Sequence, residues 1–316
     1  MCGQKSENGS SLKTNDLTKL LAITGPSEES IIQLDWAAKQ GITLAVKRDD
    51  LLHPVISGNK WRKLKHALIP AVEAKTKHII SFGGGYSNHL HALGYCCHKL
   101  NIQFTAIVRG DYSQYPSPML QDLMCWNAHI QYVDRKTYQQ RAEPEYLTML
   151  QQQYPHALVI PEGGSQLQAL QGVEEIIQEL QSEYDYILAP VASGGTLAGL
   201  IQGTRRHPKH NNCQVLGIGA LKGGGYLEQL VKNLLIDEDN TKNWQINHNY
   251  HFGGYAKSNH QLDQFCRDFC QQSKIEIEPV YSGKLFFALR DLIVKGYFPQ
   301  KSRVLALHTG GLQGAR

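Results

Sequence analysis

Short apolar runs alternate with longer amphipathic stretches from residue 42 to the C-terminus. The runs are rich in β-branched residues and continuous, which is typical of strands buried on both faces of a mainly parallel sheet. We expect strands at 42–46, 78–82, 104–108, 129–133, 157–160, 186–191, 214–219 and 303–307. We expect helices at 60–74, 88–99, 117–127, 137–152, 168–182, 197–205, 224–235, 259–273 and 283–295. This order predicts an α/β fold with crossover helices.

The size and charge of the chain argue against several functional classes. Its 316 residues are enough for one large domain or for two modest ones that share a cleft. A net charge of +4, without a long run of like charge, argues against a nucleic-acid partner. No apolar run approaches the roughly 18 residues that a membrane span requires, so no membrane partner is expected. Residues 1–16 are polar, show no apolar signal segment and are expected to be flexible.

The chain contains 7 cysteines at irregular spacing. An odd number in a chain of this size predicts a reducing, cytoplasmic location rather than a disulfide framework. Cys266 and Cys270 lie close together, but neither a second pair nor a histidine pattern accompanies them. We therefore expect no metal site.

Glycine is concentrated where four of the expected strands end. The turns are FGGGYSN (82–88), PEGGSQ (161–166), ASGGTLAG (192–199) and HTGGLQG (308–314). In open α/β sheets, ligands bind beyond the carboxyl ends of the strands, so these turns predict one shared site. The alternative is that each glycine only closes a tight turn.

The turn at 193–196 has the composition of an anion-binding loop. Glycines at 194 and 195 let backbone N–H groups approach an anion, and the following helix adds positive potential at its N-terminus. Ser193 and Thr196 add hydroxyl donors. A phosphate monoester fits this loop, whereas the absence of GK[ST] and of GxGxxG argues against a Walker A loop or a dinucleotide.

Lys60 follows Ser57-Gly58-Asn59, which is typical of a turn and helix cap, so it should lie in the first helical turn. A cation at the positive end of a helix is disfavoured, and partial burial adds to this effect. Both lower the pKa of the amine, and a neutral amine can form a Schiff base. A phosphate loop plus such a lysine is the minimum for pyridoxal 5′-phosphate. The alternative is a solvated charge beside Arg62 and Lys63.

Several motifs occur together in a characteristic order. GNKWRKL (58–64) follows KRDD (47–50), and then come SNH (87–89), SGGT (193–196), PVYSGK (279–284) and HTGG (308–311). In this order the chain resembles the 1-aminocyclopropane-1-carboxylate (ACC) deaminase/D-cysteine desulfhydrase family, from about residue 20 to the C-terminus. The resemblance implies the tryptophan-synthase-β type of fold, fold type II. Two open, mainly parallel-sheet lobes would hold pyridoxal phosphate in the cleft between them.

The resemblance also implies roles for individual residues. Lys60 is similar to the Schiff-base lysine and Asn88 to the partner of the cofactor's phenolic oxygen. The phosphate would be bound by Ser193, Gly194, Gly195 and Thr196. Ser87, Asn88 and His89 would contact the substrate, and a helix that opens there would attract its carboxylate. Tyr281 and, less closely, Tyr255 resemble tyrosines of the active site, although aromatic packing would explain either of them.

Two positions resemble the desulfhydrase branch. Ser282 follows Tyr281 where the deaminase branch has glutamate, and Thr309 replaces a leucine. A carboxylate keeps the pyridine nitrogen of the cofactor protonated, whereas a hydroxyl holds that proton less strongly. A weaker electron sink suffices when the substrate has a good β-leaving group. We therefore expect α,β-elimination from D-cysteine, with Lys60, Ser87 and Tyr281 as catalytic residues.

Three other functions stay open at this point. One is a true ACC deaminase, another is a non-catalytic pyridoxal-phosphate binder, and the third, a nucleotide-binding oxidoreductase, lacks GxGxxG. We expect a small domain at 66–165 and a large cofactor-binding domain formed by 17–65 and 166–316. Lys60 would lie near their junction. The resemblance further implies a homodimer that acts on a small amino acid.

Overall fold

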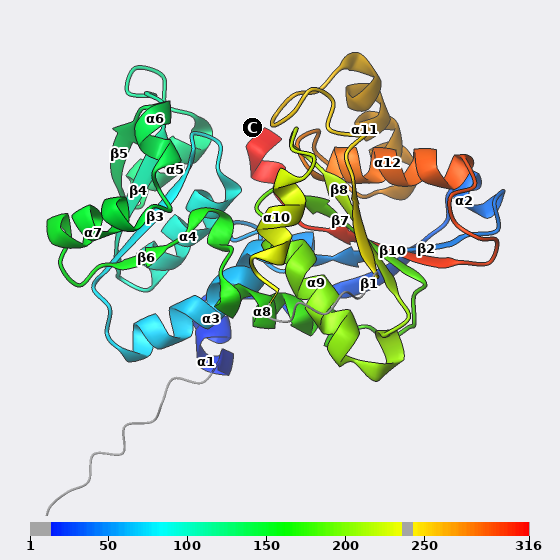
Figure 1. Cartoon of the computed structure of the whole chain (residues 1–316), viewed down its shortest axis with the longest axis horizontal. Coiled ribbons are helices and arrows are strands. Elements are labelled where there is room, and N and C mark those ends of the chain that lie inside the picture. The colour runs from blue at the N-terminus through cyan, green and yellow to red at the C-terminus, as the bar shows by residue number, and fades with distance from the viewer. Residues whose placement is uncertain (1–13, 236–242, 316) are drawn as a thin grey trace, which may run out of the picture.

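The computed structural model describes residues 14–235 and 243–315. Its strands form two separate sheets, one on each side of Figure 1. The larger sheet has the order β1 (Glu28–Ile32), β2 (Thr43–Arg48), β10 (Arg303–His308), β7 (Tyr186–Val191), β8 (Gln214–Gly219) and β9 (Trp244–Asn247). The smaller has the order β5 (His129–Val133), β4 (Gln103–Arg109), β3 (His78–Gly84) and β6 (Leu158–Ile160). Among the strands of the described residues only β1 pairs antiparallel, so the expected α/β fold with mainly parallel sheets is confirmed.

Helices cover both faces of the larger sheet, which explains its continuous apolar strands. Leu305 and Leu307 of β10 pack with α8 (Leu167–Gln178) and α9 (Gly195–Arg206). Val304 and Ala306, on the opposite face, pack with α11 (His260–Ser273) and α12 (Ser282–Val294). Successive strand residues point to opposite faces, so a strand between two helical layers has to be apolar at every position.

The smaller sheet is also covered on both faces. Ile79 of β3 packs on the side of α3 (Asn59–Glu73), α4 (Asn88–Lys99) and α5 (Pro118–Cys125). Ile80 packs with α6 (Arg135–Gln139) and α7 (Pro144–Gln153). Helix α3 runs between the two sheets in Figure 1, and it also contacts α8 of the larger sheet. The start of α3, where Lys60 lies, is therefore placed by both parts of the chain.

Some expected elements differ from those observed. The single helix expected at 137–152 is wrong, because α6 ends at Gln139 and α7 begins at Pro144 after Glu143 as its N-cap. Sequence patterns did not indicate β1, β9, α1 (Thr14–Leu20) or α2 (Asp35–Ala38). Helix α10 (Tyr226–Lys232) is shorter than expected. Of the segment expected to be flexible, 1–13 lies outside the described residues and the rest begins α1.

The carboxyl ends of β3, β6, β7 and β10 all lead into the glycine-rich turns. The chain continues from them into α4, the short 3-10 helix η2 (Glu162–Gly164), α9 and the C-terminal turn η4 (Leu312–Ala315). Figure 1 shows η4 between the two sheets. Among the described residues, no helix is long and apolar enough to span a membrane.

Candidate active site

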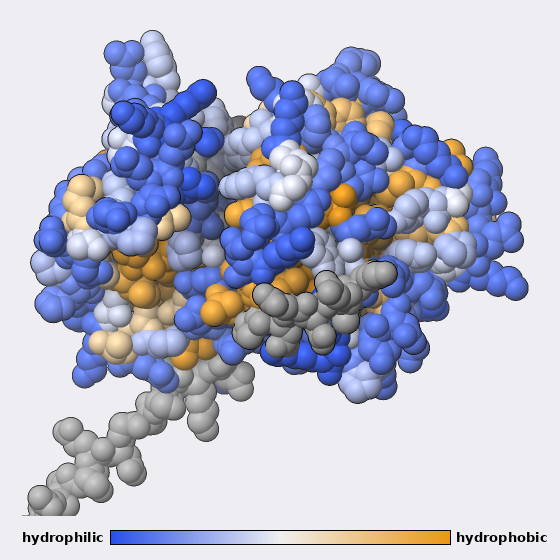
Figure 2. Space-filling view, viewed as in Figure 1, coloured by the Kyte–Doolittle hydropathy of each residue, from blue (hydrophilic) through white to orange (hydrophobic). Residues whose placement is uncertain are grey.

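A cavity of about 880 Å³ opens at these strand ends. All four glycine-rich turns contribute to its wall, through residues such as Gly84, Gly163, Ser193 and Gly310. In Figure 2 the surface is hollowed between the two lobes, and hydrophilic residues form much of the rim. The four turns therefore meet at one cavity, which is what the prediction of a shared site requires.

Lys60 reaches the cavity because a tight junction fixes the start of α3. Gly58, the N-cap, has a φ of 65°, and a Cβ at this position would lie 1.8 Å from the carbonyl oxygen of Thr309. The Asn59 N–H donates to that same oxygen at 3.3 Å. Ser57 Oγ accepts from the Gly311 N–H at 3.0 Å. The turn before Lys60 and the turn after β10 are thus one unit, which only glycine at 58 permits.

Asn59 connects the lysine to the expected phosphate loop. Its Oδ1 accepts from Lys60 Nζ at 3.0 Å, and its Nδ2 donates to Thr196 Oγ1 at 2.7 Å. Because Thr196 accepts this bond, its own hydroxyl proton is free to be donated to a ligand. Sequence reasoning used Asn59 only as part of a turn and did not assign it to the site.

The side chain of Lys60 is partly buried and lines the cavity. Burial lowers its pKa from 10.5 to about 8, against a smaller opposing effect of the Glu278 carboxylate. The direction agrees with the sequence-based expectation, and burial is its main cause. At pH 7 about a tenth of these amines is uncharged and can react with an aldehyde.

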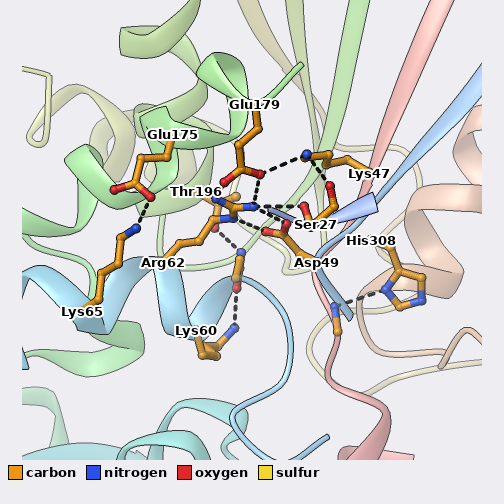
Figure 3. Close-up of polar contacts among 12 residues, drawn as sticks. Ser27, Lys47, Asp49, Lys60, Arg62, Lys65, Glu175, Glu179, Thr196 and His308 are labelled. Carbon is orange, nitrogen blue, oxygen red and sulfur yellow. Dashed lines mark hydrogen bonds and ion pairs between the residues drawn. The ribbon is translucent and has the colours of Figure 1, made fainter. Parts of the chain in front are cut away.

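The neighbouring cations of Lys60 are buried, so the interpretation as a solvated basic run is wrong. Arg62 is 2% exposed and bonds both oxygens of Asp49, at 2.7 and 2.8 Å. It also bonds Glu179 at 2.9 and 2.8 Å, and Lys47 joins that carboxylate at 3.0 Å, as Figure 3 shows. This network holds the first turns of α3 against the larger sheet.

The expected phosphate loop has the geometry of an anion site. Helix α9 begins at Gly195, and its N-cap Gly194, with a φ of 80°, makes no side-chain capping bond. The first N–H groups of the helix are therefore available to an anion. Gly195 itself does not line the cavity, whereas Ser193, Gly194 and Thr196 do.

Lys63 adds a second buried amine beside this loop. Its Nζ lies 3.4 Å from Ser165 Oγ and 3.4 Å from Ser193 Oγ, and the two hydroxyls are 2.7 Å apart. Burial, and then the nearby Lys60, hold the pKa of Lys63 well below its ordinary value. Lys63 and Ser165 were not predicted. Lys63 could have been found, since residues three apart on a helix share a face with each other.

A second helix N-terminus faces the cavity at α4. Its N-cap Ser87 accepts from the Leu90 N–H at 3.2 Å, and Ser87, Asn88 and His89 all line the cavity. Asn88 Oδ1 is buried and has no hydrogen-bond partner among the described residues. An uncompensated buried amide indicates a ligand contact. The start of α4 can thus bind an anion such as a carboxylate.

Tyr255 and Tyr281 face the cavity from the larger lobe. Their ring centroids are 6.2 Å apart and their phenols are hydrogen-bonded. Burial raises the pKa of Tyr255 and raises that of Tyr281 well above its ordinary value. Both therefore stay protonated at neutral pH, and because one phenol donates to the other, one proton of the pair is free to be donated to a ligand. Because both line the cavity, aromatic packing alone does not describe their positions.

Ser282 and Thr309 occupy different environments. Thr309 lines the cavity, whereas Ser282 is fully buried and does not. Ser282 Oγ accepts from the Glu278 N–H at 2.9 Å and lies 3.1 Å from Glu278 Oε1. Burial raises the pKa of Glu278 to about 7, although backbone N–H groups of Tyr281 and Ser282 oppose this. Sequence reasoning missed this buried carboxylate.

Comparison with known proteins assigns the family. The family model of pyridoxal-phosphate dependent enzymes matches residues 29–310, which is most of the chain. The chain belongs to this family. A putative ACC deaminase of Pyrococcus abyssi is 30% identical over 287 residues, covering 87% of this chain and 86% of that protein. Such coverage places the chain in the ACC deaminase/D-cysteine desulfhydrase group of pyridoxal-phosphate enzymes.

Two further matches support the group and the fold. The mitochondrial bifunctional D-cysteine desulfhydrase/ACC deaminase of Arabidopsis thaliana is 27% identical over 299 residues, covering 87% of this chain and 73% of that protein. The crystal structure of an ACC deaminase homologue aligns with a TM-score of 0.78 at 26% identity, covering 95% of each chain. Among pyridoxal-phosphate enzymes, this chain therefore has fold type II.

The residues present fit pyridoxal phosphate. The uncapped start of α9 with Lys63 suits a phosphate, and Lys60 offers an amine to an aldehyde. Asn88, whose buried Oδ1 has no hydrogen-bond partner among the described residues, offers a polar contact in the same cavity wall. These groups line one cavity, which is large enough for the cofactor and a small amino acid.

Proposed function

We propose that this pyridoxal-phosphate enzyme is a D-cysteine desulfhydrase, which converts D-cysteine and water to pyruvate, ammonia and hydrogen sulfide. The observation that carries the proposal is the hydroxyl of Thr309 in the cavity wall, together with the resemblance, which implies glutamate at position 282 for the deaminase branch where this chain has a serine behind that wall. A hydroxyl holds a proton on the pyridine nitrogen less strongly than a carboxylate does. That suits a substrate whose own leaving group carries away the charge, and a thiol provides one.

The chain's own residues would divide the binding work. Ser193, Gly194, Gly195 and Thr196 would bind the phosphate, aided by Lys63, and Asn88 would donate to the phenolic oxygen. When bound, the cofactor supplies an electron sink that acidifies the α-carbon of the amino acid. Thr309 would adjoin its ring nitrogen, whereas Ser282, bonded to Glu278 behind the cavity wall, would not touch the cofactor.

The proton transfers can be assigned to named atoms. Lys60 Nζ, in its neutral form, would take the α-proton of the substrate. The substrate carboxylate would bind at the start of α4, near Ser87 and His89. The Cβ–S bond then breaks, and the sulfur leaves with the electron pair. Tyr281, kept protonated with Tyr255, would donate to the departing sulfur.

The second candidate is ACC deaminase, which forms 2-oxobutyrate and ammonia. It is favoured by the name of the Pyrococcus abyssi relative, and the Arabidopsis thaliana relative carries both names. Purified protein should be given D-cysteine, L-cysteine and ACC separately, with sulfide, pyruvate and 2-oxobutyrate measured. Sulfide and pyruvate in equal amounts from D-cysteine support the proposal. Efficient 2-oxobutyrate formation without sulfide release would replace it with the deaminase.

A non-catalytic cofactor binder would bind the cofactor, but the wild-type protein would turn over none of the three substrates. If the protein is an enzyme, Lys60→Ala should lose both the absorbance of the covalently bound cofactor and nearly all turnover. The homodimer, the cytoplasmic location and the domains at 66–165 and at 17–65 with 166–316 remain predictions that accompany this proposal.

A further inference from the structure

His89 carries a buried ring nitrogen that the protein leaves unpaired. The side chain is 2% exposed and lines the cavity. Its Nε2 lies 2.7 Å from Ser81 Oγ, whereas Nδ1 has no hydrogen-bond partner among the described residues. A buried polar atom without a partner costs free energy, so an unpaired one in a cavity wall indicates a ligand contact.

The surroundings of Ser81 determine which nitrogen of His89 carries the proton. Ser81 Oγ donates its one proton to the carbonyl oxygen of Ile160 at 2.7 Å. That oxygen can only accept, so Ser81 has no second proton to give to His89. Nε2 must therefore be the N–H donor, and Nδ1 carries a lone pair. Lys60 and Lys63 lie near the ring, and burial with these cations lowers the pKa of His89 to about 3.

We propose that His89 Nδ1 accepts a hydrogen bond from a donor group of the bound amino acid. The inference rests on the proposed function and changes the predicted role of the ring, because a lone pair repels a carboxylate. The carboxylate would then bind the backbone N–H groups that open α4. Two substrate groups share the required chemistry, namely the amino group and a side-chain thiol or hydroxyl.

The tautomer can be tested without turnover. Holoenzyme with ¹⁵N-labelled histidine would be studied by long-range ¹H–¹⁵N correlation, with the His89 signals assigned by their loss in His89→Asn. We expect a protonated Nε2 and an unprotonated Nδ1. The measurement is then repeated with bound D-alanine, which has no side-chain donor and therefore probes the amino group. Because this arm needs no elimination, it stays informative if the proposed function fails. A protonated Nδ1 in the D-alanine complex would overturn the inference.

Kinetics separate the two donors. His89→Asn would be compared with wild type for kcat/KM on D-cysteine and on β-chloro-D-alanine, which lacks a side-chain donor. A loss of about 3- to 10-fold confined to D-cysteine assigns the side-chain donor. Equal losses with both, together with a D-alanine-dependent shift of Nδ1, assign the amino group. Unchanged kinetics and an unmoved Nδ1 signal would refute the proposal.

A control variant guards against an indirect effect of repacking. His91→Asn alters another buried histidine of α4, which contacts Asp122 and does not line the cavity. It should leave the ratio of the two kcat/KM values unchanged. Cofactor absorbance and thermal unfolding of each variant show whether it is folded. A ratio that changes equally in both variants would attribute the effect to packing and overturn the contact.

Discussion

The reactivity of the Lys60 amine should reach its maximum at an unusually low pH for a lysine. A pKa of about 8 in place of 10.5 raises the neutral fraction of the amine at pH 7 by about 300-fold. Only the neutral amine attacks an aldehyde, so capture of pyridoxal phosphate by the apoenzyme should rise with pH and level off above pH 8. An exposed lysine would continue to gain reactivity up to about pH 10.5.

The assay measures the rate of cofactor capture from absorbance between pH 6 and pH 10 and, in parallel, the rate for a small lysine derivative. Titration of the cofactor itself affects both rates equally, so their ratio should be constant below about pH 8 and fall above it. Borohydride reduction and peptide mapping should place the label on Lys60. Glu278→Gln should shift the midpoint to lower pH, because the Glu278 carboxylate raises the pKa of this amine. A midpoint equal to that of the free derivative would refute the assigned burial of the amine.

Three further changes test the scaffold around the site. Arg62→Met should lower the free energy of unfolding by about 3–5 kcal/mol in urea titrations, because it leaves Asp49 buried without a partner. Adding Asp49→Asn to this variant should restore part of the lost free energy of unfolding. Gly58→Ala should lower the free energy of unfolding by at least about 2 kcal/mol, since a positive φ alone costs about 1–2 kcal/mol and the added Cβ meets a carbonyl oxygen. An unchanged melting temperature would contradict this prediction. Thr196→Val should raise the cofactor dissociation constant at least about 10-fold in equilibrium dialysis, whereas Thr204→Val, in the same helix but away from the cavity, should not.

Sequence patterns located the central strands to within about two residues, because burial on both faces leaves an unmistakable apolar run. The two edge strands of the larger sheet, β1 and β9, escaped notice for the opposite reason. Strand β1 begins with Glu28 and Glu29, and β9 has exposed Gln245 at its second position. Each is a strand because a neighbour supplies its hydrogen bonds, and that neighbour is distant in the sequence.

The same distinction applies to the site. Residues recognised by type and spacing, such as Lys60 and Thr196, do line the cavity. Glu278 was missed because its role depends on burial and on the backbone N–H groups that surround it, which no local pattern encodes. Helical spacing would have resolved the basic run, since Lys60 and Lys63 share one face of α3 whereas Arg62 points to the larger sheet.

The start of α3 has to be held firmly because its chemistry is unfavourable for stability. Lys63 is buried and Lys60 partly buried, so both amines lose hydration, and Gly58 has a backbone conformation open to few residues. Each would relax if α3 could move away from the cavity. The buried pairing of Arg62 with Asp49 on the far side of the helix opposes that movement. Weakening this anchor should therefore bring the pKa of Lys60 back toward 10.5, so loss of cofactor capture at neutral pH would accompany the loss of stability.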